Sequence, residues 1–319
     1  MPSTAKGLKQ QSTFSLNELA MKVSELTSRH LPVVLKLLNK EYEGSYDFIP
    51  FDNERVLSQI RQRDLKVLVA EENEKVLGVI GTHTHNEENF EEHISWLAVD
   101  NKPNQRIVEN LLISEVENRA KGDSVITMID EGSSKINAWI SRGYKLCPGF
   151  LQMSAKLDGS TPIPKIDANI KLRSLMPDEE EELVAAINAG FGWQRLHRGV
   201  LEFWKSEDSQ FSEDWVQVAE VDGRIVSAVV ARPDTEYIKY LHLKRGHLGP
   251  AATLPEFRNK HLASALTAKS MNFLYKKGMN SARLGTSEQN ISSITLLRKL
   301  GFQVNIVRKI LRKNIKKMG

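Results

Sequence analysis

Two stretches of the chain share the same order of apolar and polar positions. Residues 67–71 (VLVAE) are followed by a polar turn and by the apolar run 76–80 (VLGVI). Residues 216–220 (VQVAE), an Asp-Gly turn and residues 225–229 (IVSAV) repeat this order 149 residues later, counted from 67 to 216. Short β-rich runs joined by a polar turn are typical of hairpins, and Asp-Gly is a strong hairpin signal. The sequence therefore predicts a β-hairpin in each half.

Other segments repeat around these hairpins. The offset of 149 also pairs residues 22–26 with 171–175, each predicted as a strand that precedes a helix. Near the end of each half, Arg-Gly-Tyr at 142–144 resembles Leu-Gly-Phe at 300–302, now 158 residues apart. An internal repeat indicates two similar domains, and the larger offset indicates an insertion of about nine residues near 234–243.

Strands alternate with helical segments in both halves. In the second half we expect a long helix over 260–277 and a shorter helix over 291–300. Such alternation predicts the α/β class, here with a mixed, mostly antiparallel sheet flanked by helices in each domain. Residues 157–165 (LDGSTPIPK) are rich in turn formers and prolines and indicate a linker. The expected division is a flexible arm at 1–20, a first domain at 21–157, a linker at 158–168 and a second domain at 169–319.

Length and composition agree with a cytoplasmic two-domain protein. A chain of 319 residues exceeds the usual size of one compact domain. No apolar run approaches the ~18 residues that a membrane span needs, and the first twenty residues lack the apolar stretch of a secretory signal. Cys147 is the single cysteine, so no intramolecular disulfide can form, which fits a reducing cytosol.

The positive charge of the chain is concentrated at its C-terminus. The formal net charge is +4, and residues 308–319 carry six basic and no acidic side chains. Taking six from +4 leaves the rest of the chain at −2. A basic tail attracts phosphates or nucleic acid, or it is simply a solvated end. Since no basic stripe interleaved with aromatics occurs elsewhere, the sequence does not favour nucleic acid as a partner.

The stretch 249–266 (GPAATLPEFRNKHLASAL) carries the most functional information. A strand is predicted to end near Thr253, and a helix begins after a proline turn and a basic loop. The first N–H groups of a helix have no internal partner and lie at the positive end of its dipole, so they attract phosphate. Arg258 and Lys260 add positive charge. The stretch is therefore either a phosphate site or an ordinary strand–turn–helix connection.

Two segments in this half resemble motifs of the GNAT superfamily of N-acetyltransferases. Residues 255–266 are similar to its acyl-CoA signature, R/Q-x-x-G-x-G/A, and residues 290–302 to its closing motif, N-x-x-A-x-x-L-Y-x-x-x-G-F. Two partial motifs in this order, about forty residues apart, are more specific than either alone. The resemblance covers residues 169–310 and, more faintly, 21–156. It implies two tandem acetyltransferase-like domains with acetyl-CoA as co-substrate.

The resemblance also implies roles for individual residues. The backbone N–H groups of 258–264 would hold the pyrophosphate, with Arg258 at the first motif position and Ala263 at the last. Residues 251–253 would hydrogen-bond the pantetheine arm like an added strand. The coenzyme-binding residues implied are Ala251, Ala252, Thr253, Arg258, Asn259, Lys260, His261, Leu262, Ala263, Ser264 and, near the thiol end, Asn290.

Two residues depart from the family pattern. His261 stands at the central glycine of the signature, where its side chain either crowds the pyrophosphate or donates to it. Leu297 stands where many members have the tyrosine that protonates the departing thiolate. A leucine cannot donate a proton, so that role is vacant or filled elsewhere.

The resemblance implies direct transfer, in which a base deprotonates an amine that attacks the thioester. His247 lies on the predicted strand before the loop, near where many members have a glutamate, and histidine titrates near neutrality. A strand histidine without a catalytic role fits equally well. His242 and Glu256 are alternative bases, and Glu256 also fits a role in the turn.

The corresponding loop of the first half is more degenerate. It keeps Gln105 but has Val108 and Asn110 where small residues belong, and Trp139 stands at the tyrosine position of the closing motif. A β-branched side chain hinders close approach of a phosphate. We therefore expect the first domain not to catalyse.

The same half contains three histidines that raise the question of a metal. His83 and His85 share a strand face, and His93 follows nearby, but no cysteine accompanies them. We expect no metal site.

Residues 189–198 (AGFGWQRLHR) lie where resembling proteins bind the acceptor. Two glycines beside two aromatics are typical of a mobile substrate-selecting loop, or the aromatics anchor the loop to the core. The basic residues indicate an acceptor with a carboxylate or phosphate.

Three functional interpretations follow. The first is an acyl-CoA-dependent N-acyltransferase, with acetyl-CoA as donor, a small-molecule or peptide amine as acceptor and the active site in the second domain. The second is a non-catalytic acyl-CoA-binding or regulatory protein, consistent with His261, Leu297 and the decayed first loop. The third is a tandem transferase that uses aminoacyl-tRNA, which would account for the basic tail. The oligomeric state is expected to be monomer or homodimer.

Overall fold

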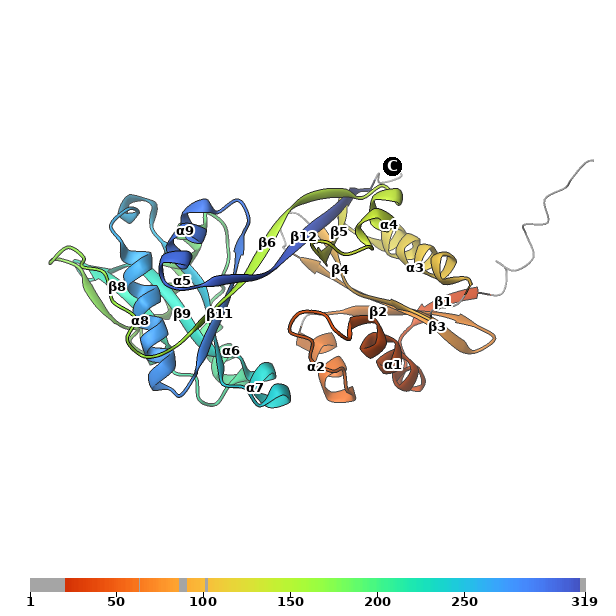
Figure 1. Ribbon diagram of the computed structural model, residues 1–319, viewed down its shortest axis with the longest axis horizontal. Coiled ribbons are helices and arrows are strands. Elements are labelled where there is room, and N and C mark those ends of the chain that lie inside the picture. The colour runs from red at the N-terminus through yellow and green to blue at the C-terminus, as the bar shows by residue number, and fades with distance from the viewer. Residues whose placement is uncertain (1–20, 63, 86–90, 101–102, 316–319) are drawn as a thin grey trace, which may run out of the picture. The chain divides into compact units, whose positions relative to one another are not determined.

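The computed structural model describes residues 21–62, 64–85, 91–100 and 103–315 (Figure 1). The arm expected at 1–20 lies outside these residues. The described chain divides into two compact units. One contains the residues up to 128 together with 141–145 and those from 311 on, and the other contains 129–140 and 146–310. Each unit is built from segments that are not consecutive in the sequence. The domains expected from the repeat are consecutive, and their boundaries stay a prediction.

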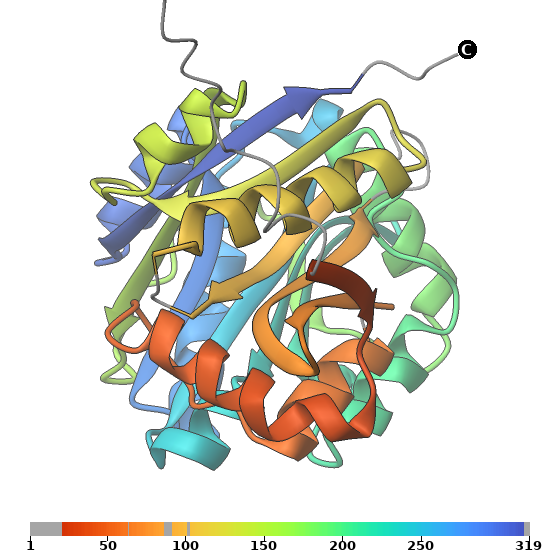
Figure 2. The ribbon, with the colours of Figure 1, turned by 90° about the vertical axis from the view of Figure 1, so that its right-hand side faces the viewer.

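The first part of the chain forms a mixed sheet with helices on both faces. The strands run in the order β1-β2-β3-β4-β5, in which β4 and β5 are parallel and the other neighbours antiparallel. Figures 1 and 2 show α1 and α2 on one side of β2, β3 and β4, and α3 on the other. The elements are β1 (Met21–Glu25), α1 (Leu31–Tyr42), α2 (Asn53–Gln62), β2 (Lys66–Glu72), β3 (Lys75–His85), β4 (Glu91–Val99), α3 (Gln105–Arg119), β5 (Ser124–Asp130) and α4 (Ile136–Ser141), with a short 3-10 helix at Ser28–His30.

The second part repeats this architecture. Its strands run in the order β6-β11-β10-β9-β8-β7, with β10 and β11 parallel and the other neighbours antiparallel. The elements are β6 (Lys145–Lys156), β7 (Lys171–Ser174), α5 (Glu180–Phe191), α6 (Val200–Glu207), β8 (Val216–Val221), β9 (Arg224–Pro233), α7 (Thr235–Leu241), β10 (Arg245–Thr253), α8 (Leu262–Lys276), β11 (Ser281–Ser287), α9 (Ile291–Lys299) and β12 (Gln303–Asn314), with 3-10 turns at Glu213–Trp215 and Pro255–Phe257. The predicted α/β class with mixed, mostly antiparallel sheets is confirmed.

The core of the second unit explains why α8 packs so closely on its sheet. Leu262, Leu266, Ser270 and Leu274 are buried and recur every four residues, with buried alanines between them. Opposite them, Gly246 on β10 leaves no room for a side chain, because a Cβ there would lie 2.6 Å from the Leu274 methyl carbons. Gly246 therefore faces α8. Alternation along the strand places Arg245 and His247 on the opposite face.

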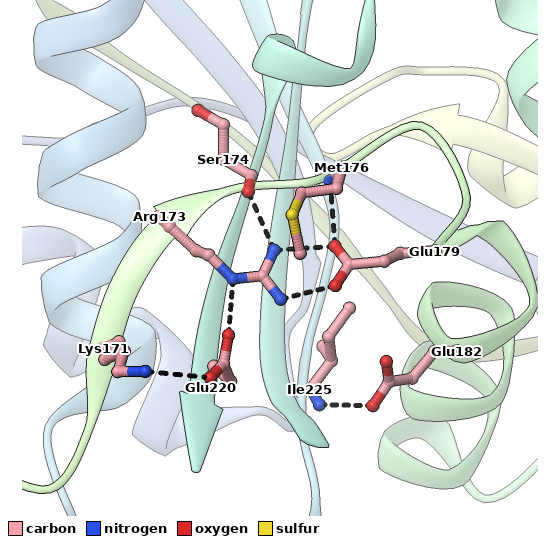
Figure 3. Close-up of polar contacts among 8 residues, drawn as sticks. All are labelled: Lys171, Arg173, Ser174, Met176, Glu179, Glu182, Glu220 and Ile225. Carbon is pink, nitrogen blue, oxygen red and sulfur yellow. Dashed lines mark hydrogen bonds and ion pairs between the residues drawn. The ribbon is translucent and has the colours of Figure 1, made fainter. Parts of the chain in front are cut away.

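An ion-pair network fixes the N-terminal end of α5 to the edge of the sheet (Figure 3). The guanidinium of Arg173 on β7 makes two 2.6 Å hydrogen bonds to Glu179 and one of 2.7 Å to Glu220 on β8. Glu182 on α5 accepts the backbone N–H of Ile225 on β9 at 2.7 Å. Bidentate Arg–carboxylate pairs define geometry well. The network therefore orients α5, whose other end lies at the candidate site.

Candidate active site

Strands β10 and β11 separate beside the sheet centre. Their parallel pairing covers only Arg245–His247 on β10, although β11 continues beside β6 up to Ser287. On its other side β10 stays paired with β9 as far as Thr253. Within the described part of the chain, residues 251–253 thus have a strand neighbour on one side only. Ala251 is exposed and Ala252 and Thr253 are half-buried, so their edge is open to an extended ligand.

The loop after β10 leads directly into the N-terminus of α8. The first helical bond runs from the N–H of Ala265 to the carbonyl of His261 at 2.9 Å. The N–H groups of Leu262, Ala263 and Ser264, as at any helix start, therefore have no acceptor inside the helix. The four preceding side chains, from Arg258 to His261, are exposed. The arrangement fits an anion, because the helix dipole and the nearby cations favour negative charge.

Arg258 is tied to the C-terminal end of α5. Its Nη2 donates to the carbonyl of Gly190 at 2.9 Å. A Cβ at Gly190 would lie 2.7 Å from the Cβ of Ala252 and 3.2 Å from the nitrogen of Thr253. Helix and strand thus meet at the open edge of β10, and Arg258 holds its charge at that junction. Whether Arg258 contacts phosphate stays a prediction.

His261 and Asn290 have well-defined local conformations. His261 has φ 61°, in the left-handed region that favours glycine, and it precedes α8 as its N-cap. Asn290 is the N-cap of α9, where its side-chain oxygen accepts the N–H of Ser293 at 3.1 Å. Asn290 therefore has a capping role in the free protein. Leu297, at the tyrosine position, is buried with 4% exposure.

His247 lies in a row of charged side chains. Its cross-strand partners are Arg232 on β9 and Arg283 on β11. Burial, and after it the charges of Arg283 and Arg232, lower the pKa of His247 to about 3. The sequence suggested a base that titrates near neutrality. The correction is that the pKa of His247 lies far below that range, first because the imidazole is buried and then because Arg283 and Arg232 lie beside it.

The alternative bases lie in different surroundings. His242 is exposed at the C-terminal end of α7, with φ 55°. Glu256 is exposed on the turn before α8 and forms an ion pair with Arg224 at 3.5 Å. Neither lies on the strand row that contains His247.

The loop between α5 and α6 is held by α5 itself. The side chain of Asn188 accepts the N–H groups of Arg195 at 2.7 Å and Leu196 at 2.8 Å, and it donates to the Leu196 carbonyl at 2.9 Å. Phe191 and Trp193 are 38% and 40% exposed and pack edge-to-face. The aromatics therefore do not anchor the loop in the core, and an asparagine fixes its backbone.

The first unit is closed where the second is open. On β4, the counterpart of β10, the N–H of Leu97 donates to the hydroxyl of Tyr42 from α1 at 3.1 Å. Val108, at the degenerate loop position, is buried, and its Cγ1 would lie 2.9 Å from a Cβ on Gly78. Trp139, which belongs to the segment 129–140 of the other unit, is buried as well. In the first unit, the Tyr42 hydroxyl thus satisfies the strand edge at Leu97, and Val108 packs closely against β3.

The histidines of the first unit do not gather ligands around them. The rings of His83 and His93 lie 4.9 Å apart, and Nδ1 of His83 is 2.9 Å from the hydroxyl of Ser95. The described residues contain no group of three His, Cys, Asp or Glu side chains placed to hold a metal ion. In the same part of the chain, no helix has the length and apolar character needed to span a membrane.

Sequence reasoning missed part of the row around His247. Arg232 lies on β9, Asp234 directly follows β9, and Arg283 lies on β11, 51 residues after Arg232. Only the strand register brings the three residues together. A local signal was present. Arg232 and Asp234 are charged residues two positions apart at the end of an otherwise buried strand. This spacing is typical of polar side chains that share one face of a sheet.

Comparison with known proteins agrees with this geometry. Residues 172–302 match the model of the acetyltransferase (GNAT) family. Two curated relatives are mycothiol acetyltransferases. That of Renibacterium salmoninarum is 23% identical over 233 residues, 65% of this chain and 67% of the relative. That of Saccharomonospora viridis is 25% identical over 165 residues, 48% of this chain and 53% of the relative. The matched segments thus span about half to two thirds of these relatives.

Solved structures show the same fold over nearly the whole chain. A GCN5-related N-acetyltransferase from Sphaerobacter thermophilus has a TM-score of 0.71 at 15% identity, covering 93% of this chain and 96% of that one. A tandem GNAT protein from the clavulanic acid biosynthesis pathway has a TM-score of 0.66 at 13% identity, covering 94% and 100%. The chain has a tandem GNAT fold, and residues 172–302 form an N-acetyltransferase domain of the GNAT family.

Proposed function

We propose that the second unit transfers the acetyl group of acetyl-CoA to an amine of a small-molecule acceptor. The observation that carries this proposal is the separation of β10 from β11 after His247, directly before the open N-terminus of α8. An extended arm fits the strand edge, and a pyrophosphate fits the helix start. The name of the curated relatives, mycothiol acetyltransferase, supports a small-molecule acceptor.

The coenzyme would bind along a continuous stretch of chain. The pantetheine arm would pair with the backbone of residues 251–253. The pyrophosphate would accept the N–H groups of Leu262, Ala263 and Ser264, with Arg258 and Lys260 beside it. In this arrangement the thioester would lie near His247, where the strands separate.

The reaction forms a C–N bond and breaks the C–S bond of the thioester. The amine loses one proton, and the departing thiolate gains one. With a pKa of about 3, the imidazole of His247 is neutral but only a weak base in the free protein. It would accept the amine proton, directly or through water, once substrate binding raises that pKa towards the working pH. Leu297 cannot supply the thiolate proton. The thiolate would take its proton from solvent or from the acceptor nitrogen.

The test measures acetyl transfer by the full-length protein to a panel of amines. The readout is the free thiol of coenzyme A that each transfer releases. We expect transfer that Arg258→Gln reduces and the matched exposed variant Arg298→Gln leaves unchanged. Acetyl-CoA that stabilises the protein without any transfer would favour the non-catalytic alternative. Failure to bind acetyl-CoA, together with binding of aminoacyl-tRNA, would favour the third interpretation.

A further inference from the structure

Five ionisable side chains share one face of β9, β10 and β11 beside the proposed reaction centre. The register pairs His247 with Arg232 on one side and with Arg283 on the other. Arg245 lies two residues before His247, and Asp234 two residues after Arg232, so both point to the same face. This is the face opposite α8, because Gly246 faces Leu274. We call these five residues the arginine row.

The arginine row holds more positive than negative charge. Asp234 accepts hydrogen bonds from Nε of Arg245 at 2.8 Å and from Nε of Arg283 at 2.5 Å. Arg245 is buried and also stacks on the ring of Tyr237 at 3.3 Å. One carboxylate thus serves two guanidinium groups. Although burial raises its pKa, Arg283 and Arg245 keep the pKa of Asp234 below its usual value, so it is ionised.

Arg232 is the third cation, and it does not share in this pairing. Its guanidinium lies 5.2 Å from the ring of Trp204 on α6, and its Nε is buried without a hydrogen-bond partner among the described residues. Burial, followed by the charges of Arg195 and Arg283, lowers the pKa of Arg232. Glu207 and Asp234 act in the opposite direction but do not outweigh these effects. With three arginines and one aspartate, the row keeps two excess positive charges.

The imidazole of His247 also contains a buried nitrogen, Nδ1, without a hydrogen-bond partner among the described residues. Buried polar atoms in folded proteins are nearly always paired, and an exception calls for a ligand or water. Two such atoms, on His247 and on its cross-strand partner Arg232, therefore mark one place on the sheet.

We propose that the arginine row binds an anionic group of the acceptor, so that the substrate is an amine carrying a carboxylate or a phosphate. Arg232 and Arg283 would hold the anion, since Arg283 is 33% exposed and Arg232 half-buried, whereas Arg245 is enclosed. Guanidinium groups suit both oxyanions because they offer paired donors. This inference rests on the proposed function only for the position of the amine.

A bound anion would also change His247. The neighbouring guanidinium charges contribute to its low pKa, and an anion between Arg232 and Arg283 offsets them. His247 then becomes a stronger base once the acceptor is in place. Acceptor binding and proton removal are thereby coupled.

Anion binding is tested first without coenzyme or transfer. The probes are inorganic phosphate and acetate, compared with chloride at equal ionic strength, and the readout is the melting temperature of the full-length protein. We expect stabilisation by at least one of the two oxyanions, with an apparent affinity that falls about tenfold in Arg232→Gln and is unchanged in Arg298→Gln. Should Arg232→Gln fail to fold, Arg283→Gln replaces it. Equal stabilisation of the parent and the row variants overturns the proposal.

The second arm measures transfer to matched amines. 2-Aminoethyl phosphate is compared with 2-aminoethanol, and β-alanine with its amide, so that the two oxyanion sources are distinguished. We expect the anionic member of one pair to have a kcat/KM about tenfold higher than its partner or, if it is not a substrate, to inhibit competitively at about tenfold lower concentration. In the row variants this difference between the two members should disappear. Equal behaviour of both members of both pairs overturns the inference. Loss of coenzyme binding would instead contradict the proposed function and leave the phosphate and acetate result standing.

Discussion

The backbone N–H of Leu97 donates to the hydroxyl of Tyr42 at 3.1 Å, across the strand of the first unit that corresponds to β10. Burial raises the pKa of Tyr42 to about 12, so the phenol stays protonated. A side chain thus satisfies a strand edge that the second unit leaves open. The two units share a fold but differ in what fills the space beside this strand.

Replacing Tyr42 should therefore affect stability. Tyr42→Phe leaves the N–H of Leu97 without its partner, and we expect the free energy of unfolding to fall by about 1–3 kcal/mol. Tyr275→Phe is the control, because Tyr275 is 45% exposed and its change should remain within about 0.5 kcal/mol. Urea unfolding measures both. Equal effects of the two variants would contradict the role given to the Tyr42 hydroxyl.

The Arg173 network predicts a pH dependence in the acid range. Hydrogen bonds from Arg173 lower the pKa values of Glu179 and Glu220 below the ordinary glutamate value of 4.5. A lowered carboxyl pKa stabilises the fold above the unfolded value, and this stabilisation is lost as the pH falls through the folded value. We expect Arg173→Gln to cost about 2 kcal/mol at pH 7 and progressively less below pH 4.5.

Lys171→Gln is the matched control for this network, because Lys171 is 77% exposed and lies 3.5 Å from Glu220. Its effect should be within about 0.5 kcal/mol at any pH. Stability is measured by denaturant titration between pH 3 and 7. A cost of Arg173→Gln that stays constant over this range would show that the ion pairs do not stabilise the fold.

His247 predicts a further loss of stability at mildly acid pH. Its folded pKa of about 3 lies below the ordinary histidine value of 6.5, so below pH 6.5 the unfolded chain binds a proton that the folded chain does not. Stability therefore decreases as the pH falls from 6.5 towards 3, by up to about 1.4 kcal/mol per pH unit from this group. His247→Gln should flatten this part of the profile. The exposed His197→Gln should retain the parental slope, and a parental slope in His247→Gln would contradict the shifted pKa.

His261 gives two readouts that move in opposite directions. Because its φ is 61°, we expect His261→Gly to relieve backbone strain and raise the free energy of unfolding by about 1 kcal/mol. Glycine carries no helix cost here, since His261 precedes α8. If the ring donates to the pyrophosphate, the same variant binds coenzyme A more weakly by about 1–3 kcal/mol. Tighter binding, measured by calorimetry, would show that the ring obstructs the site.

Much of the local structure could be predicted from the sequence, because it depends on residues that are close together along the chain. The hairpins follow alternation and turn residues, and the helix expected over 260–277 forms at Leu262–Lys276. The expected insertion near 234–243 contains α7. The turn and helix after Thr253 lie where the residues predicted them, because proline and the start of apolar helical spacing mark them within a few positions.

The side-chain relationships at the site were not readable in the same way. Arg258 contacts Gly190, and Tyr42 contacts Leu97, through tertiary packing over 68 and 55 residues. The pKa of His247 depends first on burial and then on Arg283 and Arg232, which only the strand register brings beside it. The sequence therefore located a plausible base but could not indicate its charge state, because that depends on neighbours far along the chain.

The central claim is that one coenzyme binds, in the second unit. The most direct test is calorimetric titration of the full-length protein with acetyl-CoA, for the parent, for Arg258→Gln and for Arg106→Gln, an exposed arginine at the matching loop of the first unit. The account predicts one site per chain, weakened about tenfold by Arg258→Gln and unchanged by Arg106→Gln. Two equal sites, or a loss caused by Arg106→Gln and not by Arg258→Gln, would contradict it.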